Sequence, residues 1–126
     1  MTLPCLLMVA PNGARRLHAD HPAIPLTPEA LARDAVACRD AGAAMMHLHV
    51  REPDGSHLLD AGAYREATAA IRGAVGDDLL LQVTSEAAGR YGQAVLRQSA
   101  RQVYLTPREA LLAPLATKHC ANVYKT

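Results

Sequence analysis

Two histidines, two residues apart, are the first feature of this 126-residue chain that could do chemistry. The segment AMMHLHVREPDG, residues 44–55, places His47 and His49 between apolar neighbours. Side chains alternate between faces along a strand, so both imidazoles point the same way and two of their nitrogens can bind one metal ion. The alternative is a pair of structural histidines satisfied by hydrogen bonds. A catalytic zinc usually takes three protein ligands, so these two alone do not complete a site.

Further polar residues follow the other apolar runs that are typical of strands, LLMVA at residues 6–10 and DLLLQV at residues 78–83. In parallel α/β folds, functional residues gather where strands end and the next loops begin. The pattern therefore predicts a site on one rim of the sheet, although TSE at residues 84–86 is also a typical helix cap. The candidates on this rim are Asn12, Gly13, His47, His49, Arg51, Thr84, Ser85 and Glu86.

Four histidines and one charged pair have simpler interpretations. His18, His21, His57 and His119 are expected in loops or in the C-terminal tail, outside the site. Arg51 with Asp54 fits either the rim or a surface turn.

Alternating signals for strands and helices define the fold class. Thr27 and Asp60 are predicted N-caps, with Pro28 at a first helical position, and Gly42 and Gly76 are predicted to end the two helices. The result is β-α-β-α-β with short connections, which implies a parallel sheet. The predicted strands span residues 6–10, 44–50 and 78–83, and the predicted helices span residues 28–41 and 61–75.

Composition narrows the function classes. Half of the residues are hydrophobic, which is enough for a core. The formal net charge is +1, and this balance argues against nucleic-acid and anionic-membrane partners. No apolar run is long enough to span a membrane, and the N-terminus lacks the charged region of a signal peptide. Three unevenly spaced cysteines form no zinc motif and no evident disulfide framework, so a cytoplasmic location is expected.

Five segments in order carry a family resemblance: VAPNGARR, DHPAIPLTPEALARDA, AGAAMMHLHVREPDG, YREATAAIR and LLLQVTSEAAGRYG. Together they resemble the N-terminal part of the β-keto acid cleavage enzymes, from about residue 5 to residue 92. The resemblance implies a (β/α)₈ barrel, a divalent metal that is usually zinc, and conversion of a β-keto acid and acetyl-CoA into acetoacetate and a new CoA thioester. It also implies a homo-oligomer for the full-length family.

The resemblance assigns roles to the rim residues. It implies that His47 and His49 are zinc ligands and that Thr84 is catalytic, near the carboxylate of the substrate. The substrate-binding residues are expected to be Asn12, Arg15, Ser85 and Glu86. In the aminohexanoate-cleaving member, a glutamate at the position of Arg15 holds the amino group of the substrate. Arginine here reverses that charge and predicts a neutral or anionic distal group, although a loop arginine can also face solvent or pair with Asp20.

Two departures from the family pattern leave the function open. A complete barrel needs about 250 residues, which is about twice the 126 residues of this chain. The family's third metal ligand, a late glutamate, has no counterpart here, and neither has its neighbouring arginine–aspartate pair. We therefore expect residues 1–92 to be a truncated N-terminal part of the barrel and residues 93–126 to be a divergent, partly helical tail. The alternatives are a small metal-binding module that works with a partner chain and a structural α/β domain without metal.

Overall fold

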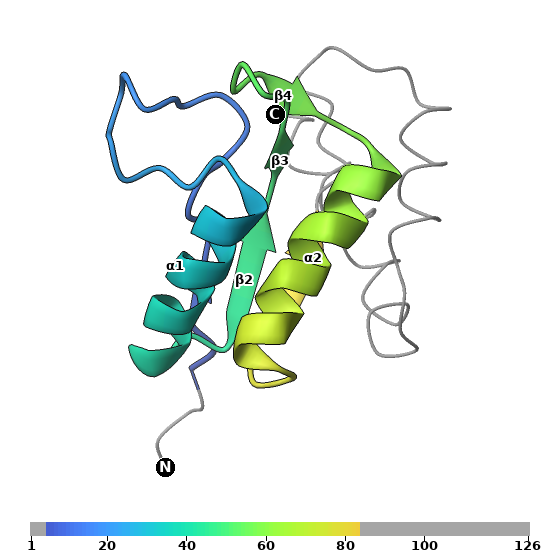
Figure 1. The fold of residues 1–126 in the computed structure, drawn as a ribbon. Coiled ribbons are helices and arrows are strands. Elements are labelled where there is room, and N and C mark those ends of the chain that lie inside the picture. The colour runs from blue at the N-terminus through green and yellow to red at the C-terminus, as the bar shows by residue number, and fades with distance from the viewer. Residues whose placement is uncertain (1–4, 84–126) are drawn as a thin grey trace, which may run out of the picture.

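The computed structural model describes residues 5–83, which form a small α/β unit with three parallel strands, two helices and a short hairpin (Figure 1). The expectations for residues 84–126 lie outside the described residues. In chain order the elements are β1 (Met8–Val9), α1 (Pro28–Asp40), β2 (Met45–Leu48), β3 (Val50–Arg51), β4 (His57–Leu58), α2 (Ala61–Val75) and β5 (Leu80–Val83).

The main sheet has the order β1-β2-β5, and both of its pairings are parallel. Each strand thus lies beside the next main-sheet strand in the sequence, without a reversal of order. Helices α1 and α2 lie side by side on the same face of this sheet (Figure 1). The predicted β-α-β-α-β order and the parallel sheet are confirmed.

A single hydrophobic core fills the space between this sheet and the helices. Burial alternates along β2 and β5, so that one face of each strand is buried and the other is half-buried. Helix α1 contributes Leu31 and Ala35, and α2 contributes Tyr64 and Ile71, all at most 1% exposed. The buried strand residues are Met46, Leu48, Leu81 and Val83. The opposite faces carry Met45, His47, Leu80 and Gln82.

The helix ends follow their local sequence. The side chain of Thr27 accepts a hydrogen bond from Ala30 N, and that of Asp60 accepts one from Ala63 N, so both predicted N-caps are confirmed. At the end of α1, Gly42 has φ +95°, and Gly42 N and Ala43 N donate to carbonyls of the last turn. This is the Schellman arrangement, which favours glycine at the left-handed position.

Three details of the predicted strands are wrong. The first strand is shorter than residues 6–10, and Leu6, Leu7 and Met8 are about half exposed rather than buried, because β1 lies at an edge of the sheet among the described residues. The second strand is interrupted at His49, whose backbone N–H and C=O pair with the side chain of Asn12 rather than with a neighbouring strand. The loop predicted after it contains the antiparallel hairpin β3–β4, with Arg51 opposite His57.

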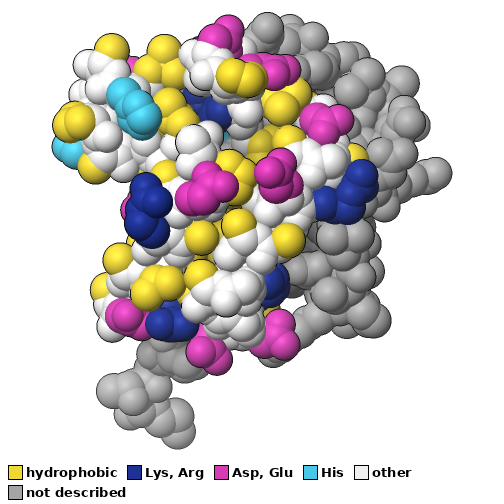
Figure 2. Space-filling model, viewed as in Figure 1, with side chains coloured by type: hydrophobic (Ala, Val, Ile, Leu, Met, Phe, Trp, Pro, Cys, Tyr) yellow, Lys and Arg dark blue, Asp and Glu magenta, His cyan; other side chains and the backbone are white. Residues whose placement is uncertain are grey.

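The surface seen in Figure 2 carries acidic and basic side chains interspersed among hydrophobic ones. This agrees with the formal net charge of +1. Among residues 5–83, no helix is long and apolar enough to cross a membrane.

Candidate functional site

The two histidines of the opening motif meet at the carboxyl end of β2. Nε2 of His47 lies 3.2 Å from Nε2 of His49, and the ring centroids are 5.0 Å apart. The predicted common orientation of the two imidazoles is thus observed. Nδ1 of His47 lies 2.9 Å from Oε1 of Gln82, which is its register partner on β5. A neighbouring strand therefore fixes the His47 ring.

These contacts define the proton positions on His47. An amide oxygen can only accept, so Nδ1 of His47 donates to Gln82 and Nε2 presents a lone pair. The Nε2–H of His49 then donates into that lone pair across the 3.2 Å contact. A metal ion bound by both Nε2 atoms would displace the proton between them.

Burial keeps His49 neutral. Its side chain is 2% exposed, and loss of hydration lowers its pKa from 6.5 to about 3, with smaller contributions from the charges of His47, His57 and Arg51. Neutral imidazole is the form that binds metal ions. His49 is thus held neutral, and its Nε2 can bind a metal ion once the proton on that atom moves to Nδ1.

The main chain of His49 is held by one amide side chain. Nδ2 of Asn12 donates to the carbonyl of His49 at 2.8 Å, and His49 N donates back to Oδ1 of Asn12 at 3.2 Å. Asn12, which is 3% exposed, thus satisfies both backbone groups of His49. This pairing explains why the strand is interrupted there, and it brings the predicted residue Asn12 into the site.

Arg51 is a second buried titratable side chain of the rim. It is 8% exposed, so the interpretation of Arg51 as a surface turn residue is wrong. Its guanidinium donates to four main-chain carbonyls, and burial lowers its pKa. Asp54 instead accepts from Ser56 N within the hairpin turn.

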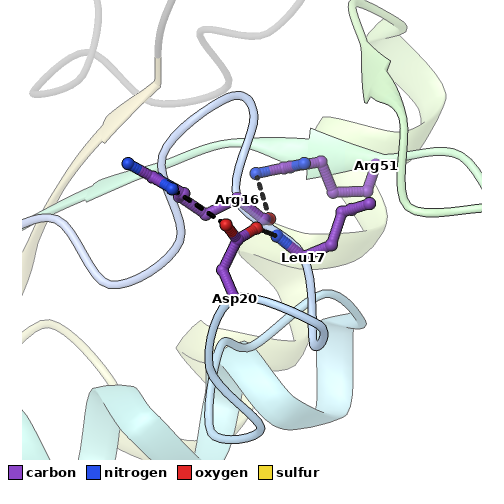
Figure 3. Close-up of polar contacts among 4 residues, drawn as sticks. All are labelled: Arg16, Leu17, Asp20 and Arg51. Carbon is purple, nitrogen blue, oxygen red and sulfur yellow. Dashed lines mark hydrogen bonds and ion pairs between the residues drawn. The ribbon is translucent and has the colours of Figure 1, made fainter.

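The loop after β1 carries Arg15 and Arg16 on its exposed side. Arg16, rather than Arg15, pairs with Asp20 at 2.8 Å, and the second carboxylate oxygen of Asp20 accepts from Leu17 N (Figure 3). The Leu17 hydrogen bond, followed by that from Arg16, holds the pKa of Asp20 below its ordinary value of 3.8. Arg15 is also exposed in this loop.

The histidine geometry fits a shared metal ion. Two nitrogens on one tetrahedral zinc, each about 2.0–2.1 Å from it, are about 3.3–3.4 Å apart. The Nε2 atoms are 3.2 Å apart, and the outward nitrogen of His47 has the acceptor that metal-bound histidines usually have. Within residues 5–83, no group of three His, Cys, Asp or Glu side chains is arranged to hold a metal.

Comparison with known proteins places this chain in a family. The beta-keto acid cleavage enzyme family matches residues 4–123. The chain belongs to this family. The match passes residue 92 and reaches most of the region predicted to be a divergent tail, whose structure is outside the described residues.

Curated relatives agree with this assignment. A 3-keto-5-aminohexanoate cleavage enzyme of Fusobacterium nucleatum is 37% identical over 67% of this chain and 31% of its own length. One from Acetoanaerobium sticklandii is 32% identical over 85% of this chain and 38% of its own. A 3-oxoadipate:acetyl-CoA acetyltransferase of Cupriavidus necator is 30% identical over 98% of this chain and 42% of its own. The chain thus spans less than half the length of these relatives.

The position of His57 differs from the one expected from the sequence. His57 was predicted in a loop outside the site, but it lies in β4, is 4% exposed, and has its ring centroid 5.6 Å from that of His49. The signal was present, because Pro-Asp-Gly at residues 53–55 is typical of a turn between two strands. The remaining predicted site residues, Thr84, Ser85 and Glu86, lie outside the described residues.

Proposed function

We propose that this chain supplies the first segment of a (β/α)₈ barrel that cleaves β-keto acids with acetyl-CoA, and that His47 and His49 are two ligands of its zinc ion. One observation carries the metal assignment: the two Nε2 atoms lie 3.2 Å apart at the carboxyl end of a parallel strand. The substrates follow from the family and from the names of the relatives.

The strand order supports the barrel. In a doubly wound sheet the strand order reverses and helices cover both faces. Here the strands follow one another in sequence order and both helices lie on one face. That arrangement agrees with a barrel, in which helices form the outer layer and the strand ends form the site.

The residues of this chain have defined tasks in the proposal. His47 and His49 bring their Nε2 atoms to one point, while Gln82 and Asn12 hold one imidazole ring and one main chain in place. Zinc bound there would act as a Lewis acid toward the β-keto oxygen. Binding of the substrate carboxylate stays assigned to Thr84, with Ser85 and Glu86 beside it.

Metal titration tests the assignment. We expect His47→Ala and His49→Ala each to weaken binding of Zn²⁺ or Co²⁺, measured by calorimetry on the 126-residue chain. His21→Ala is the matched control, because His21 is exposed and lies in the loop before α1. Equal losses in all three variants, or no loss in any, would contradict the assignment and favour structural histidines.

Activity is tested separately because the chain spans under half of its relatives. We expect acetoacetate to form from a β-keto acid and acetyl-CoA when the chain is supplied with the remaining barrel segment of a relative, either co-expressed or fused. No turnover by a folded, metal-loaded fusion would contradict the proposed reaction. Turnover by the chain alone would instead contradict the need for further barrel strands.

The proposal extends to substrate class through Arg15. Its exposed position in the loop after β1 allows it to meet the distal end of a substrate, and the relative that aligns over 98% of the chain is named for 3-oxoadipate, a diacid. A guanidinium attracts a carboxylate and repels an ammonium group. Arg15 therefore favours a neutral or anionic distal group.

A fusion of residues 1–92 with the remaining barrel of a relative tests this preference. We expect it to prefer 3-oxoadipate over 3-keto-5-aminohexanoate, and we expect Arg15→Glu to shift the ratio of kcat/KM values toward the amino substrate. Arg16→Glu is the neighbouring control. An unchanged ratio in the Arg15 variant would remove this residue from substrate selection.

A further inference from the structure

One buried guanidinium joins two loops at the rim. Nη2 of Arg51 lies 3.0, 2.6 and 3.3 Å from the carbonyl oxygens of Asn12, Gly13 and Arg16, all in the loop after β1. Nη1 of Arg51 donates to the carbonyl of Gly55, in the hairpin turn, at 2.7 Å. Figure 3 shows this side chain directed at the backbone of Arg16.

The contacts use both the charge and the shape of the guanidinium. All four acceptors are main-chain carbonyls, so substitution of a neighbouring side chain leaves the acceptors in place. Hydrogen bonds from a charged donor are stronger than neutral ones. Lysine would keep the charge, but its single ammonium group lacks the planar fork that reaches two loops at once.

The clamped loop leads directly to the histidine pair. Asn12, whose carbonyl accepts from Arg51, also holds the amide and the carbonyl of His49 through its side chain. A continuous set of hydrogen bonds therefore runs from Arg51 through Asn12 to His49. The clamped carbonyls of Gly13 and Arg16 also lie on either side of Arg15 in the sequence.

We propose that Arg51 is a positioning residue, which clamps the loop from Asn12 to Arg16 and thereby fixes His49 through Asn12. This extends the proposed function, because it explains how a loop residue can set the place of a metal ligand. Arg51 does not itself touch the metal or the substrate in this role.

An apolar contact offers a competing account of the same loop. A Cβ at Gly55 would come within 2.7 Å of Cδ2 of Leu17, so the hairpin turn and the loop after β1 pack closely at this point. If that packing alone held the loop, Leu17→Ala would release it and Arg51→Lys would not. The two accounts therefore predict opposite results for two single substitutions.

Residue-resolved amide exchange on the 126-residue chain distinguishes them. We expect Arg51→Lys to speed exchange of the His49 amide by about 10- to 100-fold, as loss of charged hydrogen bonds implies, while amides in α1 and α2 stay protected. Arg39→Met is the control, because it removes an arginine that pairs with Asp40 on α1. Exchange that rises equally in both helices, or an unchanged His49 amide, would overturn the proposal.

A double-mutant cycle with Asn12 adds a second readout. Asn12→Ala and Arg51→Lys should each raise the Co²⁺ dissociation constant about 10-fold or more, the usual effect of losing a residue that orients a ligand. If both act through one connection, the double variant loses no more than the larger single loss. Additive losses would assign Arg51 a separate structural role.

The two proposals fail in different ways. If the unsubstituted chain binds no Co²⁺, the metal assignment fails, and the exchange of the His49 amide still decides whether Arg51 positions it. If Arg51→Lys unfolds the chain, Leu17→Ala decides the matter: the His49 amide should stay protected, because Arg51 still holds the loop. Fast exchange of the His49 amide in that variant would overturn the proposal.

Discussion

The core between sheet and helices and the rim at the carboxyl end of β2 are both buried, but by different means. The core consists almost entirely of apolar side chains such as Leu48, Ile71 and Leu79, which need no directed partner. The rim buries Asn12, His49 and Arg51, and two of these satisfy main-chain groups of distant segments. Packing in the core supplies stability, whereas directed hydrogen bonds at the rim supply position.

The core and the rim also differ in how well they tolerate substitutions. Apolar side chains can be exchanged for others of similar volume at a modest cost in stability. A buried amide or guanidinium has no such substitute, because its donors are matched to acceptors at fixed positions. We therefore expect core substitutions to change the free energy of unfolding and rim substitutions to change binding.

The largest expected effect tests the core. Ile71 is fully buried in α2. Its replacement by alanine should lower the free energy of unfolding by about 2–5 kcal/mol, because a cavity remains. Ile71→Val should cost about 0.5–1.5 kcal/mol and gives a graded point in the series. Urea denaturation followed by circular dichroism measures both. A valine variant that is destabilised more than the alanine variant would contradict the cavity argument.

The next effect tests the rim. Gln82→Met removes the acceptor of the His47 Nδ1–H and should weaken metal binding about 10-fold or more, while the free energy of unfolding changes by less than about 1 kcal/mol. Gln82→Glu keeps an acceptor and should retain metal affinity. Calorimetry and urea denaturation on the same samples separate the two quantities. Equal metal affinities in the methionine and glutamate variants would show that Gln82 does not orient His47.

Much of the sheet and helices that form the core could be predicted from the sequence. Local signals such as Thr27, Asp60 and Gly42 define where the helices begin and end, and they act within a few residues of the chain. The alternation around His47 fixes which side chains share a face of the strand. The common orientation of the two histidines therefore required no tertiary information.

The connections of the rim could not be predicted in the same way. The hydrogen bonds of Asn12 to His49 and of Arg51 to the loop join residues 37 and 39 positions apart. No local pattern shows that a main-chain carbonyl will face a distant guanidinium. For this reason Arg51 could equally be interpreted as a surface residue, and the interruption of β2 at His49 was not foreseen.

The smallest effect concerns the outer part of the clamped loop. The carboxylate of Asp20 accepts from Leu17 N and from Arg16, and these contacts lower its pKa below 3.8. Because the folded state favours the charged carboxylate, its contribution to stability is fully present above pH 3.8. It is lost as the pH falls from that value through the lowered pKa. Exchange of the Leu17 amide should therefore accelerate over this acidic range, beyond the intrinsic change with pH.

Two variants separate the causes of the Asp20 shift. Arg16→Ala should raise the pKa of Asp20 only part of the way, measured by NMR titration of its carboxyl carbon, because the Leu17 hydrogen bond is the larger cause. Asp20→Asn should remove the pH dependence of the Leu17 amide and leave the His49 amide protected, since Arg51 clamps the loop through carbonyls on the other side. If Asp20→Asn exposed the His49 amide as much as Arg51→Lys does, the outer turn rather than the buried guanidinium would hold the rim together.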